Sequence, residues 1–119
     1  MKLSVITVNY NNITGLKKTF ESVFCQTNKE FEYIVIDGAS VDGSVDEIIA
    51  HKADIEYYVS EPDRGVYDAM NKGIKVATGD YCVFMNSGDC FYSDDVVEAA
   101  LPLLDGTDIV YGNTHYRRY

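Results

Sequence analysis

Short runs of β-branched and aromatic residues alternate with amphipathic stretches along this chain of 119 residues. The runs at residues 3–8, 31–36, 55–59 and 81–85 are mostly apolar, which is typical of strands that are buried in a parallel sheet. Each run is followed by apolar residues at helical spacing. The alternation therefore predicts one α/β domain, with a mostly parallel, Rossmann-like sheet, right-handed crossovers and helices on both faces.

Capping patterns predict where the first two helices begin. Thr14 can cap a helix that carries Leu16 and Phe20 toward the core. Ser44 and Glu47 have the spacing of a capping box at the start of the second helix. The expected core face of the third helix consists of Tyr67, Met70, Ile74 and Ala77.

The last part of the chain predicts a further helix and a short strand. Ser93 is the expected cap of the fourth helix, and Pro102 should kink or shorten it. Residues 108–111 follow as a strand, and the chain ends in Y-R-R-Y without a closing helix. This pattern predicts a domain that is truncated at the C-terminus. Its exposed sheet edge could pair with a second copy, so a homodimer is left open.

Charge and cysteine content exclude several classes of protein. The net charge is −9, and no cluster of Lys or Arg precedes the terminal Y-R-R-Y, so nucleic acid is excluded as a main partner. Cys25, Cys82 and Cys90 are odd in number and form no C-x-x-C pair, which predicts reduced, partly buried thiols. The apolar run at residues 3–8 is too short for a signal peptide or a membrane span. We therefore expect a cytoplasmic location.

Polar segments follow three of the predicted strands, at residues 9–12, 37–42 and 86–89. In a parallel α/β sheet such ends collect where ligands bind. A carboxylate there can accept hydrogen bonds from a ribose or a base, or bind a divalent cation. The chain contains neither G-x-G-x-x-G after its first strand nor a Walker A sequence. A diphosphate bridged by a metal ion is therefore the expected way for so acidic a chain to bind a nucleotide.

Four motifs, in order, resemble those of the family 2 glycosyltransferases, which have the GT-A fold. They read V-I-T-V-N-Y-N-N, F-E-Y-I-V-I-D-G-A-S-V-D-G-S, S-E-P-D-R-G-V-Y-D-A-M-N-K-G and A-T-G-D-Y-C-V-F-M-N-S-G-D. The resemblance implies transfer of a sugar, usually with inversion, from a UDP- or GDP-type nucleotide-diphosphate sugar to a glycan or lipid-linked acceptor hydroxyl. It implies a role in polysaccharide or glycolipid biosynthesis, in the cytoplasm or peripherally at the inner face of the membrane.

The resemblance also assigns contacts with the nucleotide sugar. Asp37 matches the first acid of the family's D-D-G-S-T-D motif, which contacts the base and the ribose, and Asp42 matches its last acid. Gly38 replaces the second acid, and Met70 replaces an arginine of many relatives. The expected nucleotide-sugar-binding residues are Val8, Asn9, Tyr10, Asp37, Ala39, Asp42, Arg64, Asp68, Asn71, Asn86 and Ser87.

The turn at residues 86–89 resembles the family's D-S-D-D segment, whose carboxylates hold the metal ion and the diphosphate. Asn86 and Gly88 replace the two acids of the D-x-D, and only Asp89 keeps its carboxylate. The resemblance therefore implies Mg²⁺ or Mn²⁺ bound by Asp89, phosphate oxygens and water. In such relatives the catalytic base lies well beyond the position of Tyr119. We thus expect residues 1–119 to be the nucleotide-sugar-binding half of a longer enzyme, inactive alone.

Simpler explanations exist for the expected site residues, and other functions stay open. Asp37 and Asp89 can be turn residues, Arg64 can pair with a neighbouring acid, and Asp68 can be a solvated helix residue. A flavodoxin-like receiver domain would carry an acidic pair after the first strand, and a nucleotidyltransferase a basic, glycine-rich loop; this chain has neither. A relative that binds nucleotide sugars without catalysis is compatible with the altered D-x-D.

Overall fold

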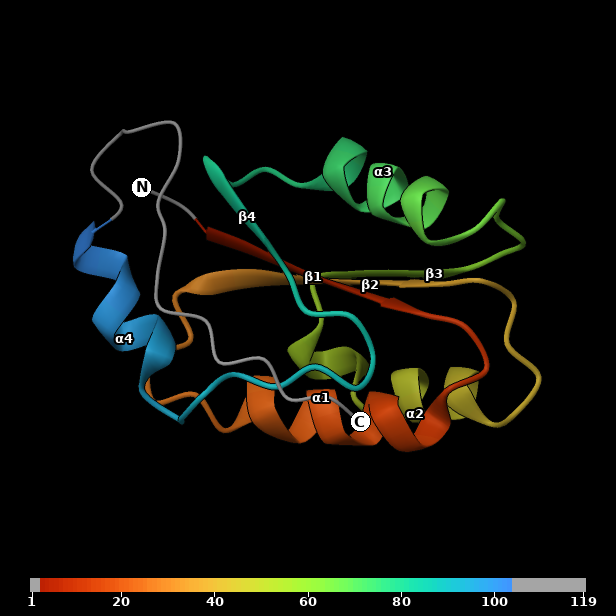
Figure 1. Cartoon of the computed structure of the whole chain (residues 1–119), viewed down its shortest axis with the longest axis horizontal. Helices are drawn as coiled ribbons and strands as arrows, with labels where there is room; N and C mark the ends of the chain where they lie inside the picture. The colour runs from red at the N-terminus through yellow and green to blue at the C-terminus, as the bar shows by residue number, and fades with distance from the viewer. Residues whose placement is uncertain (1–2, 104–119) are drawn as a thin grey trace.

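The computed structural model describes residues 3–103, and its strands form one parallel sheet between helices (Figure 1). The sheet order is β3-β2-β1-β4, from β1 (Leu3–Asn9), β2 (Phe31–Asp37), β3 (Tyr57–Ser60) and β4 (Tyr81–Phe84). All of their pairings are parallel. One face of the sheet is covered by α1 (Ile13–Phe24) and α2 (Ser44–Ala50), and the other by α3 (Val66–Val76). The predicted α/β architecture is confirmed.

Side chains of the two central strands alternate between two apolar clusters. Val5 and Val35 belong to a cluster with Phe20 of α1, whereas Ile6 and Ile36 belong to a second cluster on the side of α3. Every residue of β1 is buried, as the mostly apolar run predicts for a strand that is covered on both faces. The strands are therefore held firmly at the centre of the sheet, and their carboxyl ends share one edge.

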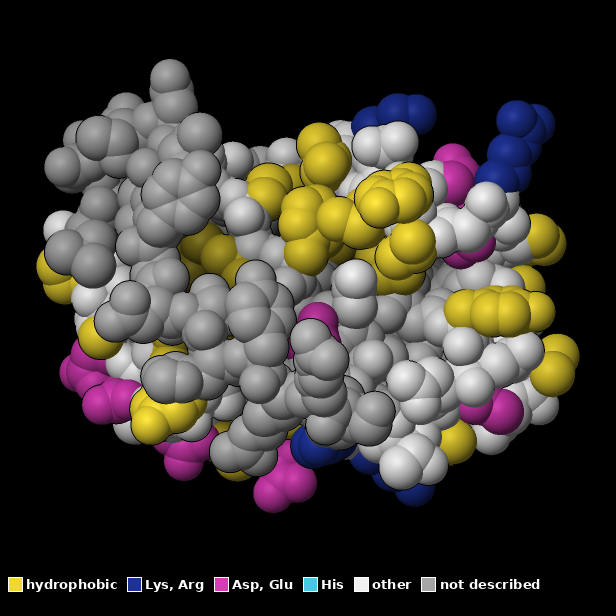
Figure 2. All heavy atoms as spheres, in the orientation of Figure 1, with side chains coloured by type: hydrophobic (Ala, Val, Ile, Leu, Met, Phe, Trp, Pro, Cys, Tyr) yellow, Lys and Arg dark blue, Asp and Glu magenta, His cyan; other side chains and the backbone are white. Residues whose placement is uncertain are grey.

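Helix α3 approaches the sheet through small residues. A Cβ atom on Gly73 would lie 2.6 Å from Cγ2 of Ile6, and Ala69 is also buried. This close approach turns Tyr67 (79% exposed) and Ile74 (48% exposed) toward solvent, so the predicted core face of α3 is wrong for these two residues. The other two predicted positions pack against the core as expected. Figure 2 shows hydrophobic side chains gathered where Figure 1 places α3.

Two predicted helix starts are wrong. Asn12, not Thr14, caps α1, because its Oδ1 accepts a hydrogen bond from a backbone N–H of the first turn at 3.1 Å. Gly43, with φ +98°, is the N-cap of α2, so Ser44 is already helical and forms no capping box with Glu47. In both cases the cap lies one or two residues nearer to the preceding strand than predicted.

The third strand and the fourth helix also differ in detail. A 3-10 turn, η1 (Lys52–Asp54), delays the start of β3. Helix α4 (Val96–Ala100) begins after Asp95, and the expected cap Ser93 instead donates a hydrogen bond from Oγ to Oδ1 of Asp95. The 3-10 turn η2 (Leu101–Leu103), which contains Pro102, ends α4 early, as the proline predicts. The strand predicted at residues 108–111 lies outside the described residues.

All three cysteine side chains lie at the surface of the protein. Cys25, Cys82 and Cys90 are free, as expected, but all three are exposed, so the prediction of partly buried thiols is wrong. Partial desolvation of the Cys82 side chain and the charge of Glu32 nevertheless raise the pKa of its thiol. Within residues 3–103, none of the helices is both long and apolar enough to cross a bilayer.

Candidate functional site

Each strand of the sheet delivers one polar side chain to the same edge. Asn9 and Asp37 are the last residues of β1 and β2 and are partners in register, and Ser60 is the partner of Asp37 on β3. Ser87 follows β4 and donates a hydrogen bond from its backbone N to the carbonyl of Val8 at 3.0 Å. We call Ser87, Asn9, Asp37 and Ser60 the polar row, because they cross the sheet in this order.

Hydrogen bonds join the members of the polar row into one chain. Ser87 Oγ donates to Asn9 Oδ1 at 2.7 Å, and Asn9 Nδ2 donates to Asp37 Oδ1 at 2.8 Å. Ser60 Oγ donates to Asp37 Oδ2 at 2.8 Å, and Ser40 donates to Asp37 from both its backbone N and its Oγ. The Asp37 carboxylate is fully buried and accepts four hydrogen bonds. Its buried charge is thus stabilised by fixed donors.

An open cleft of about 720 Å³ lies above the polar row and beside the start of α3. Six of the eleven expected nucleotide-sugar-binding residues line this cleft: Val8, Asn9, Tyr10, Ala39, Asn86 and Ser87. Tyr10 is 66% exposed there, so its ring is available to a ligand. Ala39 has φ +62°, a left-handed conformation that is uncommon for a residue with a Cβ. Ser40 donates hydrogen bonds to Asp37, and these bonds hold the segment that contains Ala39.

The other expected binding residues do not line the cleft. Asp37 lies beneath it, and Asp42 accepts hydrogen bonds from the backbone N of Ile13 and from the N and Oγ of Ser44. Asp42 therefore joins the starts of α1 and α2. The hydrogen bonds from the Ser44 hydroxyl and from these backbone N–H groups lower the pKa of the Asp42 carboxyl below its usual value. A contact between Asp42 and the nucleotide stays a prediction of the family resemblance.

The residues near the start of α3 that were expected to contact the ligand do not line the cleft either. Asp68 Oδ2 accepts a hydrogen bond from the backbone N of Arg64 at 2.9 Å, which stabilises the first turn of α3. Arg64 and Asn71 are exposed. Glu61 pairs with Lys72 at 3.2 Å and not with Arg64. The roles of Arg64, Asp68 and Asn71 toward phosphate or sugar therefore stay predictions.

Residues 86–89 form a tight turn at the end of the cleft next to β4. The backbone N of Asp89 donates to the carbonyl of Asn86 at 2.8 Å, and Gly88 has φ +99°, which its lack of a Cβ permits. Thr19 fastens the turn to α1, because its Oγ1 donates to the carbonyl of Asp89 at 2.7 Å. The Asp89 side chain is exposed at this turn.

The turn also carries a side-chain oxygen that is a candidate ligand for a cation. Asn86 Oδ1 is buried and has no hydrogen-bond partner among the described residues. Within residues 3–103, no group of three His, Cys, Asp or Glu side chains is arranged to hold a metal ion. Mg²⁺ is typically bound by one or two protein oxygens together with phosphate oxygens and water. Asn86 Oδ1 is thus a candidate oxygen ligand, and a metal ion bound by Asp89 stays a prediction of the family resemblance.

Sequence reasoning missed several residues of the cleft, including Gly38, Pro62 and Asp63. Asp63 lies in the loop that follows β3, so it obeys the same strand-end rule that identified the other three polar segments. The signal was therefore present in the sequence.

A parallel α/β sheet with a ligand-sized cleft above the carboxyl ends of its strands is typical of doubly wound α/β proteins, which bind their ligands there. Residues 4–119 match the model of Glycosyl transferase family 2, and the chain belongs to this family. An uncharacterised glycosyltransferase of Mycobacterium tuberculosis is 44% identical over 109 residues, which are 87% of this chain and 40% of that protein. The chain spans less than half the length of this relative. A PGL/p-HBAD biosynthesis glycosyltransferase of Mycobacterium bovis is 31% identical over 96% of this chain and 47% of its own length.

Solved structures show the same fold. A mannosyltransferase from Pyrobaculum calidifontis, in complex with GDP-Man and Mn²⁺, matches with a TM-score of 0.74 and 26% identity over 88% of this chain and 33% of its own. TarS of Staphylococcus aureus matches with a TM-score of 0.79 and 24% identity over 88% of this chain and 32% of its own. The predicted GT-A fold is thereby confirmed for the part of the chain that these matches cover.

Proposed function

We propose that this protein transfers a sugar from a nucleotide-diphosphate sugar to an acceptor hydroxyl, with inversion, in polysaccharide or glycolipid biosynthesis. The observation that supports this most strongly is the cleft above the polar row in a chain of Glycosyl transferase family 2. The similar mannosyltransferase was solved with GDP-Man and Mn²⁺, and a relative is named for PGL/p-HBAD biosynthesis. A glycan or lipid-linked acceptor is consistent with both names.

The order of the strands suggests how the donor lies in the cleft. Tyr10 and Gly38 follow the central strands β1 and β2, and Asp63 follows β3. Asn86 and its turn follow β4 at the other end of the row. We place the nucleobase beside Tyr10 and the diphosphate beside the turn at residues 86–89. The sugar then points away from the base, toward the acceptor.

Bond changes in this reaction define what the chain must provide. The acceptor oxygen bonds to the anomeric carbon while the bond from that carbon to the diphosphate breaks, and the nucleoside diphosphate leaves with the electron pair. A divalent cation, Mg²⁺ or Mn²⁺, would neutralise charge on the leaving diphosphate, held by Asn86 Oδ1 and Asp89. The acceptor proton passes to a general base. That base stays predicted beyond Tyr119.

The role of this chain's own residues is to bind and orient the donor. Hydrogen bonds fix the side chains of the polar row, so the row forms a preorganised surface that can contact the ribose and the diphosphate. The ring of Tyr10 gives the base an aromatic surface at the mouth of the cleft. A cytoplasmic or peripheral inner-membrane location and a homodimer stay predictions.

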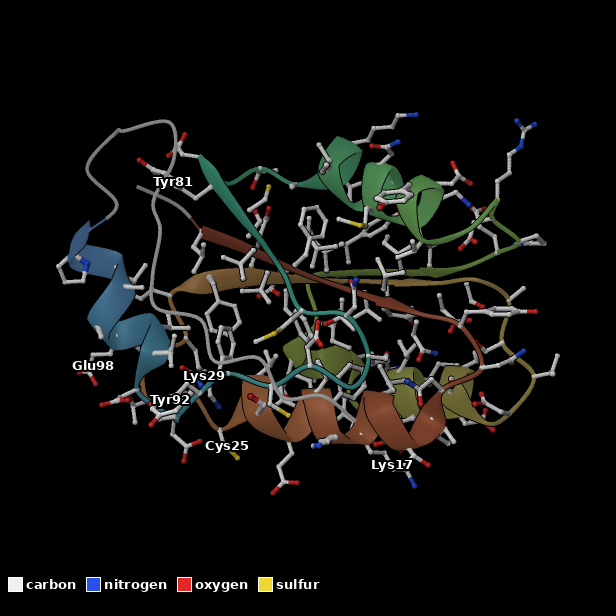
Figure 3. The ribbon with its side chains drawn as sticks, viewed as in Figure 1. Lys17, Cys25, Lys29, Tyr81, Tyr92 and Glu98 are labelled. Carbon is white, nitrogen blue, oxygen red and sulfur yellow. The ribbon has the colours of Figure 1, made fainter. Side chains whose placement is uncertain are left out.

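Calorimetric titration of the full-length protein with UDP, GDP, dTDP and CMP, each with Mn²⁺ or with EDTA, tests this proposal. We expect UDP or GDP to bind with Mn²⁺, and Tyr10→Ala to weaken that binding by about tenfold because base stacking is lost. Tyr92→Ala is the matched control: it removes a tyrosine that is 74% exposed and that lies near α4, away from the carboxyl ends of β1, β2 and β3 (Figure 3). Its affinity for the nucleotide should be unchanged.

Two results would change the proposal. Binding of none of these nucleotides to the folded protein would contradict it. The other result is that the protein binds UDP or GDP but releases no nucleoside diphosphate from any nucleotide sugar when acceptor extracts are present. That result would indicate a relative that binds nucleotide sugars without catalysis.

A further inference from the structure

The cleft contains one carboxylate that faces the region where the nucleobase is placed, and it belongs to Asp63. Asp63 lines the cleft, and its Oδ1 accepts a hydrogen bond from the backbone N of Gly65 at 3.0 Å, which fixes the carboxylate. Its Oδ2 lies 2.9 Å from the point where a Cβ atom on Gly38 would be. Among residues 3–103, this second oxygen accepts no hydrogen bond. It is thus a fixed acceptor that remains available.

Tyr10 borders the same point of the backbone. Its Cδ1 lies 3.1 Å from the position of that Cβ atom on Gly38. The aromatic ring and the Asp63 carboxylate therefore flank one backbone position, which carries no side chain of its own. A flat ring bound against Tyr10 would bring its polar edge close to Asp63 Oδ2.

Asp37, the acid that the family resemblance assigns to the base, is placed differently. Its carboxylate is completely buried, and Asn9, Ser40 and Ser60 occupy both of its oxygens. A base could pair with it only by displacing one of these donors. The geometry points to Asp37 as a positioning residue for the cleft floor and to Asp63 as the acid that contacts the base.

We propose that Asp63 selects donors whose base carries an imino N–H, such as uracil, thymine or guanine. This inference rests on the proposed function and adds the identity of the residue that reads the base. An ionised carboxylate only accepts hydrogen bonds. N3–H of uracil and thymine and N1–H of guanine donate, whereas N3 of cytosine and N1 of adenine are acceptors. When N3 of cytosine or N1 of adenine faces Asp63 Oδ2 in place of such an N–H, two acceptors meet without a proton, which costs affinity.

Gly38 makes this arrangement possible. A side chain at this position would project into the space that Asp63 Oδ2 occupies, because the distance of 2.9 Å is shorter than real Cβ contacts. The D-D-G-S-T-D motif has an acid here, so the Asp63 carboxylate occupies the place of the missing side chain. Gly38→Ala should displace Asp63 without altering its chemistry. It offers a test that is independent of substitutions at Asp63.

The experiment measures the dissociation constants of UDP, GDP, CDP and ADP for the full-length protein by calorimetry with Mn²⁺. The wild type should bind UDP or GDP about tenfold or more tightly than CDP and ADP. Asp63→Asn should reduce this ratio to about twofold, because an amide can turn its N–H₂ toward an acceptor base. The amide oxygen of this variant can still accept from the backbone N of Gly65, so the loop should keep its shape.

Controls separate this inference from the proposed function. Glu61→Gln changes an acid of the same loop that pairs with Lys72 outside the cleft lining, and the ratio should not change. Gly38→Ala should lower the ratio as Asp63→Asn does, and it serves if Asp63→Asn does not fold. If UDP or GDP binds but both variants keep the wild-type ratio, Asp63 does not read the base, and this inference alone is overturned. If none of the nucleotides binds, the proposed function is overturned with it.

Discussion

Strand β2 carries a buried carboxylate near each of its ends, but only one of the two lies beneath the cleft. Asp37 is 0% exposed and Glu32 is 9% exposed. Glu32 accepts hydrogen bonds from Ser4 Oγ, from the backbone N and Oγ1 of Thr78, and from the backbone N of Gly79 at 3.3 Å. Both acids are thus surrounded by donors. Asp37 lies beneath the cleft, whereas Glu32 lies at the opposite edge of the sheet.

In both places the buried acid at the end of the strand fixes the conformation of the neighbouring backbone. Glu32 fastens the connection from α3 to β4 at the amino edge of the sheet, and it is not among the residues that line the cleft. Asp37 fastens the loop that contains Ala39 at the carboxyl edge. The same chemistry therefore supports folding at one edge and shapes a binding site at the other.

The largest expected effect is that of Asp37→Ala. The donors on Asn9, Ser40 and Ser60 would lose a charged acceptor, so the free energy of unfolding should fall by about 3 kcal/mol or more. UDP or GDP affinity should fall by about tenfold or more, because the Ala39 segment is no longer held. Urea unfolding and calorimetry measure the two effects. Loss of binding at unchanged stability would mean instead that Asp37 contacts the ligand directly.

Glu32→Ala should have an effect on stability alone. We expect the free energy of unfolding to fall by about 2 kcal/mol, because Thr78 and Ser4 lose their acceptor in a slightly less buried site. The nucleotide dissociation constant should stay within about twofold of the wild type, since the acid lies at the far edge of the sheet. Glu30→Ala, an exposed neighbour, is the control and should change neither quantity. A nucleotide affinity that falls with Glu32→Ala would remove the distinction between the two edges.

The order and type of the elements could be predicted because central parallel strands are covered on both faces. Their runs are mostly apolar and rich in β-branched residues, so β1 and β2 were placed to within one residue. Helix starts could not be predicted as well, since Asn12 and Thr14 are both good caps and only the path from the strand decides between them. The core face of α3 was partly wrong because Gly73 sets how close the helix lies.

The place of the site could be predicted, but not which acids face it. The strand-end rule led to Asn9, Tyr10 and Ser87, all of which line the cleft. Whether a carboxylate points up into the cleft or down into the sheet depends on loop conformation, which local sequence does not determine. Asp37 turns inward to four donors, while Asp63 remains at the surface of the cleft.

A smaller effect is expected from Gly73→Ala on α3, the helix that runs from the cleft to the connection held by Glu32. The new Cβ would lie 2.6 Å from Cγ2 of Ile6, so helix or sheet must shift, at a cost of about 1–3 kcal/mol. The thermal midpoint measures this cost. Ile74→Ala, on the exposed face of the same helix, should cost less than about 1 kcal/mol. Equal losses for the two variants would show that α3 does not pack tightly through Gly73.

The smallest effect concerns Asp42, an exposed acid whose hydrogen bonds resemble those of the two buried ones. Its pKa is lowered from 3.8 in the folded chain, chiefly by the Ser44 hydroxyl. A lowered pKa means that the stabilisation is present above the unfolded-state pKa and is lost as the pH falls through the folded-state pKa. Asp42→Asn should therefore lower the thermal midpoint slightly at pH 7, and the difference from the wild type should shrink below about pH 4. A difference that is independent of pH would mean that Asp42 acts through the shape of its side chain and not through its charge.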